Sequence, residues 1–176
     1  MPIFSYIVNC NVVNYIVECH KMAEKTRYEI ENSLGKLLDW ASQFMRLGLN
    51  RKFAGAGHEA TSEQWKILIT LWAEDGLTQK QIAERSCKNK VSVVKLIDGL
   101  ERRGLVNRLP DPGDRRSNRI FLTPKGKSVQ EELIALAQQN RDQAANGIDP
   151  AELTICINVL KQIIVNMNGD TNGNAE

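Results

Sequence analysis

The run from Asn89 to Thr123 constrains the fold of this chain more than any other stretch. It reads NKVSVVKLIDGLERRGLVNRLPDPGDRRSNRIFLT. Apolar residues recur at spacings of three, one and three, which predicts an amphipathic helix over residues 90–103, closed by Gly104. These residues are Val93, Leu96, Ile97 and Leu100. Two short strands, LVNRL and NRIFLT, then flank a polar, arginine-rich turn, PDPGDRR.

The outer side of this helix suits a nucleic acid. It carries Val91, Val94, Lys95, Asp98 and Arg102. The major groove of B-DNA is about 12 Å wide and admits one α-helix. The basic hairpin tip, in turn, suits contacts with phosphates or with a minor groove.

The charge distribution favours the same partner. The formal net charge is only +2, but residues 78–127 contain 13 Lys or Arg against 5 Asp or Glu, while the remainder contains 10 against 16. A basic segment inside an acidic chain indicates an anionic partner for that segment. The alternative is a solvated charged surface; the helix and hairpin context favours DNA.

The run LTQKQIAERSCKNKVSVVKLIDGLERRGLVNRLPDPGDRRSNRIFLTPKGK resembles a MarR-type winged helix-turn-helix regulator. The resemblance is carried by the D-G-L-E-R-R-G-L-V helix end, the D-R-R tip and the L-T-P-K-G return, and spans Ser62 to Gly126. It implies a mainly α fold with a small β-wing, in which N- and C-terminal dimerisation helices flank the winged helix-turn-helix.

The resemblance also implies which helix residues meet bases and phosphates. They are Val91, Ser92, Val94 and Lys95. Ser92 and Lys95 have the hydrogen-bonding groups for such contacts, and the valines offer apolar contact to thymine methyls. Lys88 and Lys90 precede this set and suit phosphate contacts.

In the hairpin tip, the resemblance implies that Arg116 enters the minor groove while Asp114 holds its guanidinium. Arg115 is expected to contact the DNA backbone. Gly113 is expected to supply a positive φ for the turn.

The flanking sequence predicts further helices. One runs from Tyr28 to about Leu49, followed by a loop over residues 51–60. Capping-box patterns at Thr61 and Thr78 start two more, and Thr123-Pro124 starts one that continues to about Asn146. A last helix follows Asp149-Pro150.

The expected organisation has five parts. They are an N-terminal extension (1–25), a dimerisation helix and loop (26–60), the DNA-binding domain (61–126), C-terminal dimerisation helices (127–168) and a frayed tail (169–176). The last helix has a coiled-coil-like seam of Leu153, Ile157, Leu160, Ile164 and Met167. The outer helices therefore predict a homodimer; the alternative is that they complete a monomer's core.

Residues 1–21 are apolar but interrupted by three asparagines, too short and polar for a membrane span and unlike a signal peptide. An extra packing element, a regulatory arm and sequence upstream of the true start remain open, and the last is preferred. The four cysteines and two histidines show no metal-ligand spacing. With no catalytic constellation and no cofactor motif, the chain is expected to be a non-enzymatic cytoplasmic protein with free thiols.

The resulting hypothesis is a dimeric repressor that leaves a palindromic operator in double-stranded DNA when a small aromatic or phenolic ligand binds. Trp40, Phe44 and Trp65 are candidate ligand contacts, with a plain core role as the alternative. A redox response through Cys87, which lies near two lysines, is a second mode of regulation. A protein-interaction module and an architectural DNA binder are the competing functions.

Overall fold

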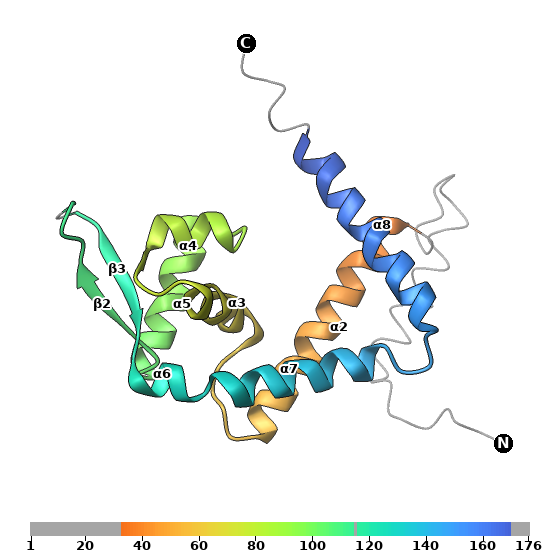
Figure 1. Cartoon of the computed structure of the whole chain (residues 1–176), viewed down its shortest axis with the longest axis horizontal. Helices are drawn as coiled ribbons and strands as arrows, with labels where there is room; N and C mark the ends of the chain where they lie inside the picture. Colours follow the sequence, from red (N-terminus) through yellow and green to blue (C-terminus); the bar gives the residue numbers. More distant parts are fainter. Residues whose placement is uncertain (1–32, 115, 170–176) are drawn as a thin grey trace, which may run out of the picture. The chain divides into compact units, whose positions relative to one another are not determined.

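The computed structural model describes residues 33–114 and 116–169 (Figure 1). The chain divides into two compact units, Met1–Gly48 and Leu49–Glu176, and each is described by itself. The elements are α2 (Leu34–Gly55), α3 (Ser62–Ala73), β1 (Leu77–Thr78), α4 (Gln79–Arg85), α5 (Lys90–Arg102), β2 (Val106–Pro110), β3 (Asn118–Leu122), α6 (Pro124–Ser128), α7 (Gln130–Ala144) and α8 (Pro150–Gly169). The elements are mostly helices, with one small sheet, which confirms the expected fold class.

The predicted helix starts are confirmed by their capping hydrogen bonds. The side chains of Thr61 and Thr78 each accept a bond from the third helical amide, and glutamines at that position bond back to each cap. The Thr123 side chain likewise accepts a bond from the third helical amide of α6, that of Gly126. Pro124 is in the first helical position, where its missing N–H costs nothing.

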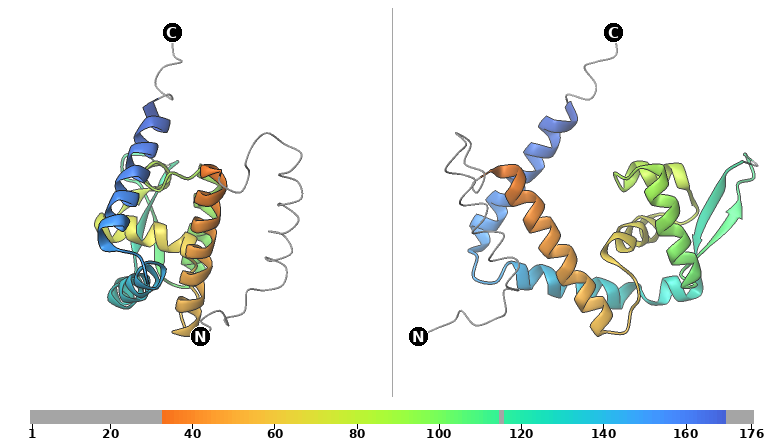
Figure 2. Two further views of the ribbon diagram at one scale, coloured as in Figure 1. Left: turned by 90° about the vertical axis from the view of Figure 1, so that its right-hand side faces the viewer. Right: turned by 180° about the vertical axis from the view of Figure 1, so that it is seen from behind.

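Helices α3, α4 and α5 form the core of the larger unit, and the β2–β3 hairpin, the wing, projects beside them (Figures 1 and 2). The stripe predicted for α5 faces inward: Val93, Ile97 and Leu100 are fully buried. They meet equally buried side chains from α3 and α4, including Ile67 and Ile82. The apolar spacing of α5 therefore fixes which side of this helix is left outside.

The sheet has three antiparallel strands in the order β1-β3-β2. Leu77 pairs with Ile120, and Val106 pairs with Leu122. Leu77, Val106 and Ile120 are all buried against the helical core, so the base of the wing is part of that core. The sequence predicted β2 and β3 but not β1, which is only two residues long and exists through its pairing with β3.

The loop predicted over residues 51–60 is wrong for its first half. Helix α2 continues to Gly55, because Phe53 is fully buried and its ring meets Trp65 at a centroid distance of 5.7 Å. The chain leaves the helix at Gly57, whose φ of +81° suits a glycine. The start predicted for this helix near Tyr28 lies outside the described residues.

The single helix predicted after Pro124 is two helices, α6 and α7, separated at Val129. Helix α6 packs closely on the segment between α5 and β2: a Cβ on Gly126 would lie 2.0 Å from the carbonyl oxygen of Leu105. Leu133 is then fully buried and anchors the start of α7. Each of the two helices thus has a buried residue, Gly126 in α6 and Leu133 in α7.

Helix α8 begins after Asp149, as predicted, with the Asp149 carboxylate accepting hydrogen bonds from the amides of Ala151 and Glu152. None of the α8 side chains described is buried. No helix among the residues that the structure describes is long and apolar enough to cross a membrane.

Candidate nucleic-acid interface

The outward face of α5 presents the residues expected to touch DNA. Val91 is 67% exposed, Val94 is 37% exposed, and Lys90 and Lys95 are also exposed. The Asn89 side chain caps the helix by accepting a 2.8 Å bond from the Ser92 amide. The cap leaves the positive end of the helix dipole on this face, which favours a phosphate.

The turn before α5 is strained at one residue. Cys87 adopts a φ of 52°, the left-handed region that side chains rarely occupy. Its thiol is free and exposed. By contrast, the positive φ expected at Gly113 is wrong, because the wing turn is made there by the Asp111 carboxylate, which accepts a 2.8 Å bond from the Gly113 amide.

Lys88 differs from the other lysines predicted to meet phosphates. Its ammonium group forms an ion pair and a hydrogen bond with the Glu63 carboxylate on α3, and its side chain is only 17% exposed. The hydrogen bond from Lys88 holds the pKa of the Glu63 carboxyl below its ordinary value. Lys88 thus anchors the turn before α5 to α3.

The wing tip is ordered by two aspartates. Asp114 accepts a 2.9 Å hydrogen bond from the backbone amide of Arg116, whereas the expected pairing with the Arg116 guanidinium is not formed among the described residues. Asp111 forms the ion pair instead, at 2.9 Å from Arg119. Arg115 lies outside the described residues. The tip is therefore held by its backbone, and the exposed Arg116 side chain extends from it.

A second ion-pair group joins the wing to α5. The Arg108 guanidinium on β2 lies 2.5 Å from both the Asp98 and the Glu101 carboxylates. The group was not predicted, because Asp98 was placed only on the outer face of the helix. The sequence pattern that indicates this ion-pair group is a pair of acids three residues apart, Asp98 and Glu101, followed beyond a glycine by Arg108. The single positive charge of Arg108 offsets one of the two carboxylate charges beside the exposed face of α5 and holds both carboxylates in place.

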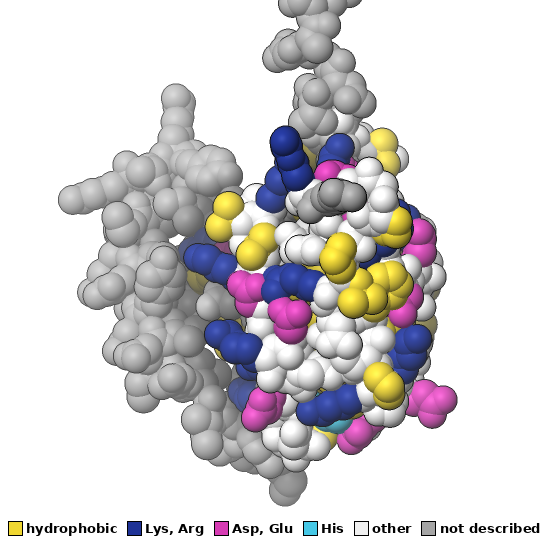
Figure 3. Space-filling view, turned by 90° about the vertical axis from the view of Figure 1, so that its left-hand side faces the viewer, with side chains coloured by type: hydrophobic (Ala, Val, Ile, Leu, Met, Phe, Trp, Pro, Cys, Tyr) yellow, Lys and Arg dark blue, Asp and Glu magenta, His cyan; other side chains and the backbone are white. Residues whose placement is uncertain are grey.

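Figure 3 shows Lys and Arg side chains spread over the face that carries α5 and the wing, with Asp and Glu between them. Arg119 also donates a 3.2 Å hydrogen bond to the Gly76 carbonyl, which ties β3 to the start of the sheet. Helix, wing and sheet are thus tied together, and basic side chains alternate with acidic ones over this face.

The predicted ligand residues fall in different places. Trp65 lies against Trp72, at a centroid distance of 5.4 Å, in a shallow hollow of about 370 Å³ between α3 and α7. Trp72 is held there by a 3.0 Å bond from its indole N–H to the Gly126 carbonyl. Trp40 and Phe44 belong to the smaller unit, where Phe44 is 52% exposed and the Lys36 ammonium lies 4.5 Å from the Trp40 ring centroid.

Within residues 33–114 and 116–169, no three or more His, Cys, Asp or Glu side chains are grouped to hold a metal ion.

Comparisons with known proteins decide the family. The model of the MarR family matches residues 60–117, which hold α3 to the wing tip. The chain is also 33% identical to the solved structure of the transcriptional regulator PA3341, with a TM-score of 0.65 over 78% of this chain and 99% of that one. This chain belongs to the MarR family.

Two further comparisons are with other transcriptional regulators. PcaV from Streptomyces coelicolor is 25% identical and superposes with a TM-score of 0.67 over 78% of this chain and 99% of PcaV. The regulator TtmR from Methylorubrum extorquens is 37% identical over 81 residues, which are 46% of this chain but only 42% of TtmR. Members of the MarR family are transcriptional regulators that bind DNA as dimers, and are not enzymes.

Proposed function

We propose that this MarR-family chain is a homodimeric repressor that reads a palindromic operator in double-stranded DNA and is released by a small aromatic ligand. The observation that carries the proposal is the exposed outer face of α5, which stands beside a wing fixed to it by Arg108. A helix presented in this way fits the major groove, and the wing tip then reaches the neighbouring minor groove.

The proposed contacts follow from exposure and chemistry. Val91 and Val94 would touch thymine methyls, and Lys95 would donate to guanine or phosphate. Lys90, Ser92 and the wing arginines Arg115 and Arg116 complete the set. Asp114 supports Arg116 through its backbone amide. Lys88 would reach a phosphate only by releasing Glu63, so its contribution should be smaller.

Exposed apolar side chains of α8 support dimerisation. Ile164 is 59% exposed and Met167 is 67% exposed, and both belong to the predicted seam. Ile155, Val159 and Val165 add exposed apolar surface beyond that seam. A surface of this kind marks an interface, and the proposed occupant is a second copy of the chain.

The proposed effector site centres on the hollow beside Trp65 and Trp72, whose other lining residues are mostly apolar. Flat aromatic molecules stack favourably on such rings. Trp40 and Phe44, which belong to the smaller unit, stay candidate ligand contacts predicted from the sequence alone.

The test is DNA binding measured by fluorescence anisotropy at several salt concentrations. Lys95→Ala and Arg116→Ala should each weaken binding, and the slope of log affinity against log salt should fall by about 0.9 for each lost phosphate contact. Arg141→Ala, which removes an exposed arginine paired with Asp142 on α7, is the matched control and should bind like wild type. Wild-type binding by both interface variants would show that the interface has been placed on the wrong face.

A redox response is a second candidate, favoured by the exposed Cys87 thiol immediately before α5. Mild peroxide should then lower the DNA affinity of wild type and leave Cys87→Ser unchanged. An equal response of both proteins to peroxide would exclude Cys87 as the sensor.

A further inference from the structure

One glycine lies inside α5, where glycine is an unfavourable residue. Gly99 is buried and is the only glycine of this helix. A glycine in a helix interior destabilises the helix relative to alanine, so a buried one at such a position indicates a neighbour that leaves no room for a side chain. The neighbour is Gln64 of α3: a Cβ on Gly99 would lie 2.3 Å from the Gln64 Nε2.

The Gln64 side chain is buried and uses both ends of its amide group. It is 4% exposed. Its Oε1 accepts a 3.1 Å hydrogen bond from the Thr61 amide, which completes the cap of α3. Its Nε2 donates a 3.4 Å hydrogen bond to the carbonyl oxygen of Leu96 in α5. Because a buried amide group is costly to leave without partners, these two bonds hold the side chain in one position between the helices.

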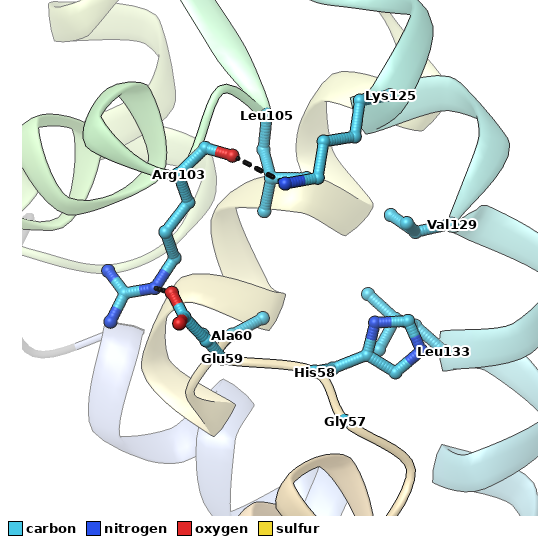
Figure 4. Close-up of a pocket in the computed structure, with 9 residues that line it drawn as sticks. All are labelled: Gly57, His58, Glu59, Ala60, Arg103, Leu105, Lys125, Val129 and Leu133. Carbon is cyan, nitrogen blue, oxygen red and sulfur yellow. Dashed lines mark hydrogen bonds and ion pairs between the residues drawn. The ribbon is translucent and has the colours of Figure 1, made fainter.

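Arg103 holds the same part of α5 from another direction. Leu96 and Gly99 are three residues apart and therefore lie on one face of the helix. The Arg103 Nη1 donates a 2.9 Å hydrogen bond to the Gly99 carbonyl oxygen, and its Nε lies 3.6 Å from the Glu59 carboxylate (Figure 4). Glu59 belongs to the loop before α3, so two side chains link the middle of α5 to the start of α3.

This link determines how the outer face of α5 is presented. The Leu96 carbonyl that Gln64 bonds follows directly after Val94 and Lys95. Moving α5 along its axis, or turning it about that axis, would break this bond and bring a residue with a Cβ against Gln64. Hydrogen bonds to base edges weaken steeply with distance and angle, whereas contacts with phosphates carry no sequence information. A displaced α5 should therefore lose base contacts first.

We propose that Gln64 is a positioning residue for the reading of DNA sequence: its amide, seated against Gly99, fixes α5 on α3 and so aligns Val94 and Lys95 with the base edges. Gln64 acts through α5, because its own side chain is buried. The inference rests on the proposed function, in which α5 reads DNA. It deepens that function by assigning part of the sequence specificity to a side chain on a different helix.

The experiment compares the affinity for two duplexes at one salt concentration, measured by fluorescence anisotropy. One duplex is the sequence that the wild-type chain enriches from a random pool, and the other is a scrambled sequence of the same composition. The ratio of the two affinities is the sequence specificity, which a merely structural or merely electrostatic change does not alter, because such a change affects both duplexes equally.

Gln64→Glu keeps an oxygen that can cap α3 but removes the donor to Leu96. It should lower the specificity ratio about tenfold, a usual effect of losing one base contact, and leave the affinity for the scrambled duplex nearly unchanged. Gln162→Glu is the matched control, because it adds the same charge at an exposed position of α8. Its specificity ratio should equal that of wild type.

Gly99→Ala tests the same contact without altering Gln64. The added Cβ displaces the Gln64 amide, so the specificity ratio should fall as it does for Gln64→Glu, although alanine favours the helix and limits any loss of thermal stability. Gly55→Ala, where a Cβ meets nothing within 4 Å, should leave the ratio unchanged. The double variant of Gln64 and Gly99 should lose no more than either single variant, because both changes remove one contact.

The outcomes separate this inference from the function on which it rests. A wild-type chain that binds both duplexes equally would overturn the proposed function, and the positioning role with it. If wild type prefers the enriched duplex and both Gln64→Glu and Gly99→Ala keep that preference, the proposed function stands and the positioning role is overturned. Equal losses of affinity for the two duplexes, or additive losses in the double variant, also overturn it. Thermal unfolding of each variant shows that it is folded.

Discussion

At the scale of single residues, Arg108 pairs with two carboxylates that lie beside the proposed DNA-binding face of α5. Without it, the Asp98 and Glu101 carboxylates would stand unpaired beside the proposed phosphate contacts. Arg108→Ala should therefore lower DNA affinity about tenfold, or roughly 1.4 kcal/mol, through repulsion and a less fixed wing. The measurement is anisotropy at constant salt.

Neutralising both acids separates these two causes. Asp98→Asn with Glu101→Gln, added to Arg108→Ala, should restore most of the affinity if repulsion dominates. Unchanged affinity in Arg108→Ala would contradict any role for this ion-pair group in binding.

The contact between Lys88 and Glu63 should give stability a defined pH dependence. The pKa of Glu63 is lowered in the folded protein, first of all by the hydrogen bond from Lys88. The pair therefore stabilises the fold above the unfolded carboxyl pKa of about 4.3, and this contribution is lost as pH falls through the lower, folded pKa. Since Glu63 is 36% exposed, the contribution should stay below about 1 kcal/mol.

The check is urea unfolding of wild type and Lys88→Gln across pH. The stability difference should be present at neutral pH and shrink as the pH falls below the ordinary carboxyl pKa. Lys80→Gln serves as the control, because Lys80 lies 4.0 Å from Glu84 in a pair that is largely exposed. If the stability difference between wild type and Lys88→Gln does not change with pH, the ion pair is not the cause of that difference.

At the scale of elements, the close approach of α6 to the segment between α5 and β2 should affect the free energy of unfolding. Gly126→Ala places a methyl group 2.0 Å from the Leu105 carbonyl oxygen, so the backbone must shift, and a loss of about 1–3 kcal/mol is expected. Gly55→Ala is the matched control, because a Cβ there meets nothing within 4 Å and alanine favours the helix. Equal stability of the two variants, measured by urea unfolding, would contradict the packing described.

The sequence correctly predicted those features of the elements that depend on neighbouring residues. The threonine caps and the apolar stripe of α5 depend on neighbours within one or two turns, and the structure confirms them. The helical residues 51–55 and strand β1 depend on distant partners, namely Trp65 for Phe53 and Ile120 for Leu77. A glycine-rich stretch and a two-residue strand give no local sign of such contacts.

The same distinction between local and distant contacts applies to the candidate site. Spacing alone placed Val91, Val94 and Lys95 on the outer face of α5, where they lie. The sequence predicted that Asp114 holds Arg116, but through the guanidinium rather than the backbone amide of Arg116. The ion pairs of Asp111 and Arg108 were not predicted, because these two residues and Asp114 are all charged and lie near one turn. Only the folded hairpin decides which of them meets Arg119, Arg116 or α5.

At the scale of the whole molecule, dimerisation should depend on the exposed apolar side chains of α8. Ile164→Glu should weaken the dimer on the order of hundredfold or more, because an unpaired carboxylate buried in an interface costs several kcal/mol. The fold of the single chain should survive, since Ile164 makes no core contact. Gln162→Glu, an exposed polar position on the same helix, should leave the dimer intact.

Sedimentation velocity over a range of protein concentrations measures this change. Monomeric Ile164→Glu should also bind DNA weakly, because only one half-site is then held. A wild-type chain that remains monomeric, or a dimer insensitive to Ile164→Glu, would contradict the role given to α8.

The central claim is that two copies of α5 and the wing read a palindromic DNA sequence. Selection of bound duplexes from a random pool by the wild-type chain tests it most directly. The expected result is an enriched inverted repeat whose half-sites lie about one helical turn apart, roughly 34–36 Å, and which Lys95→Ala no longer enriches. Duplexes recovered without any common sequence would contradict sequence-specific reading and indicate a binder that contacts only the DNA backbone.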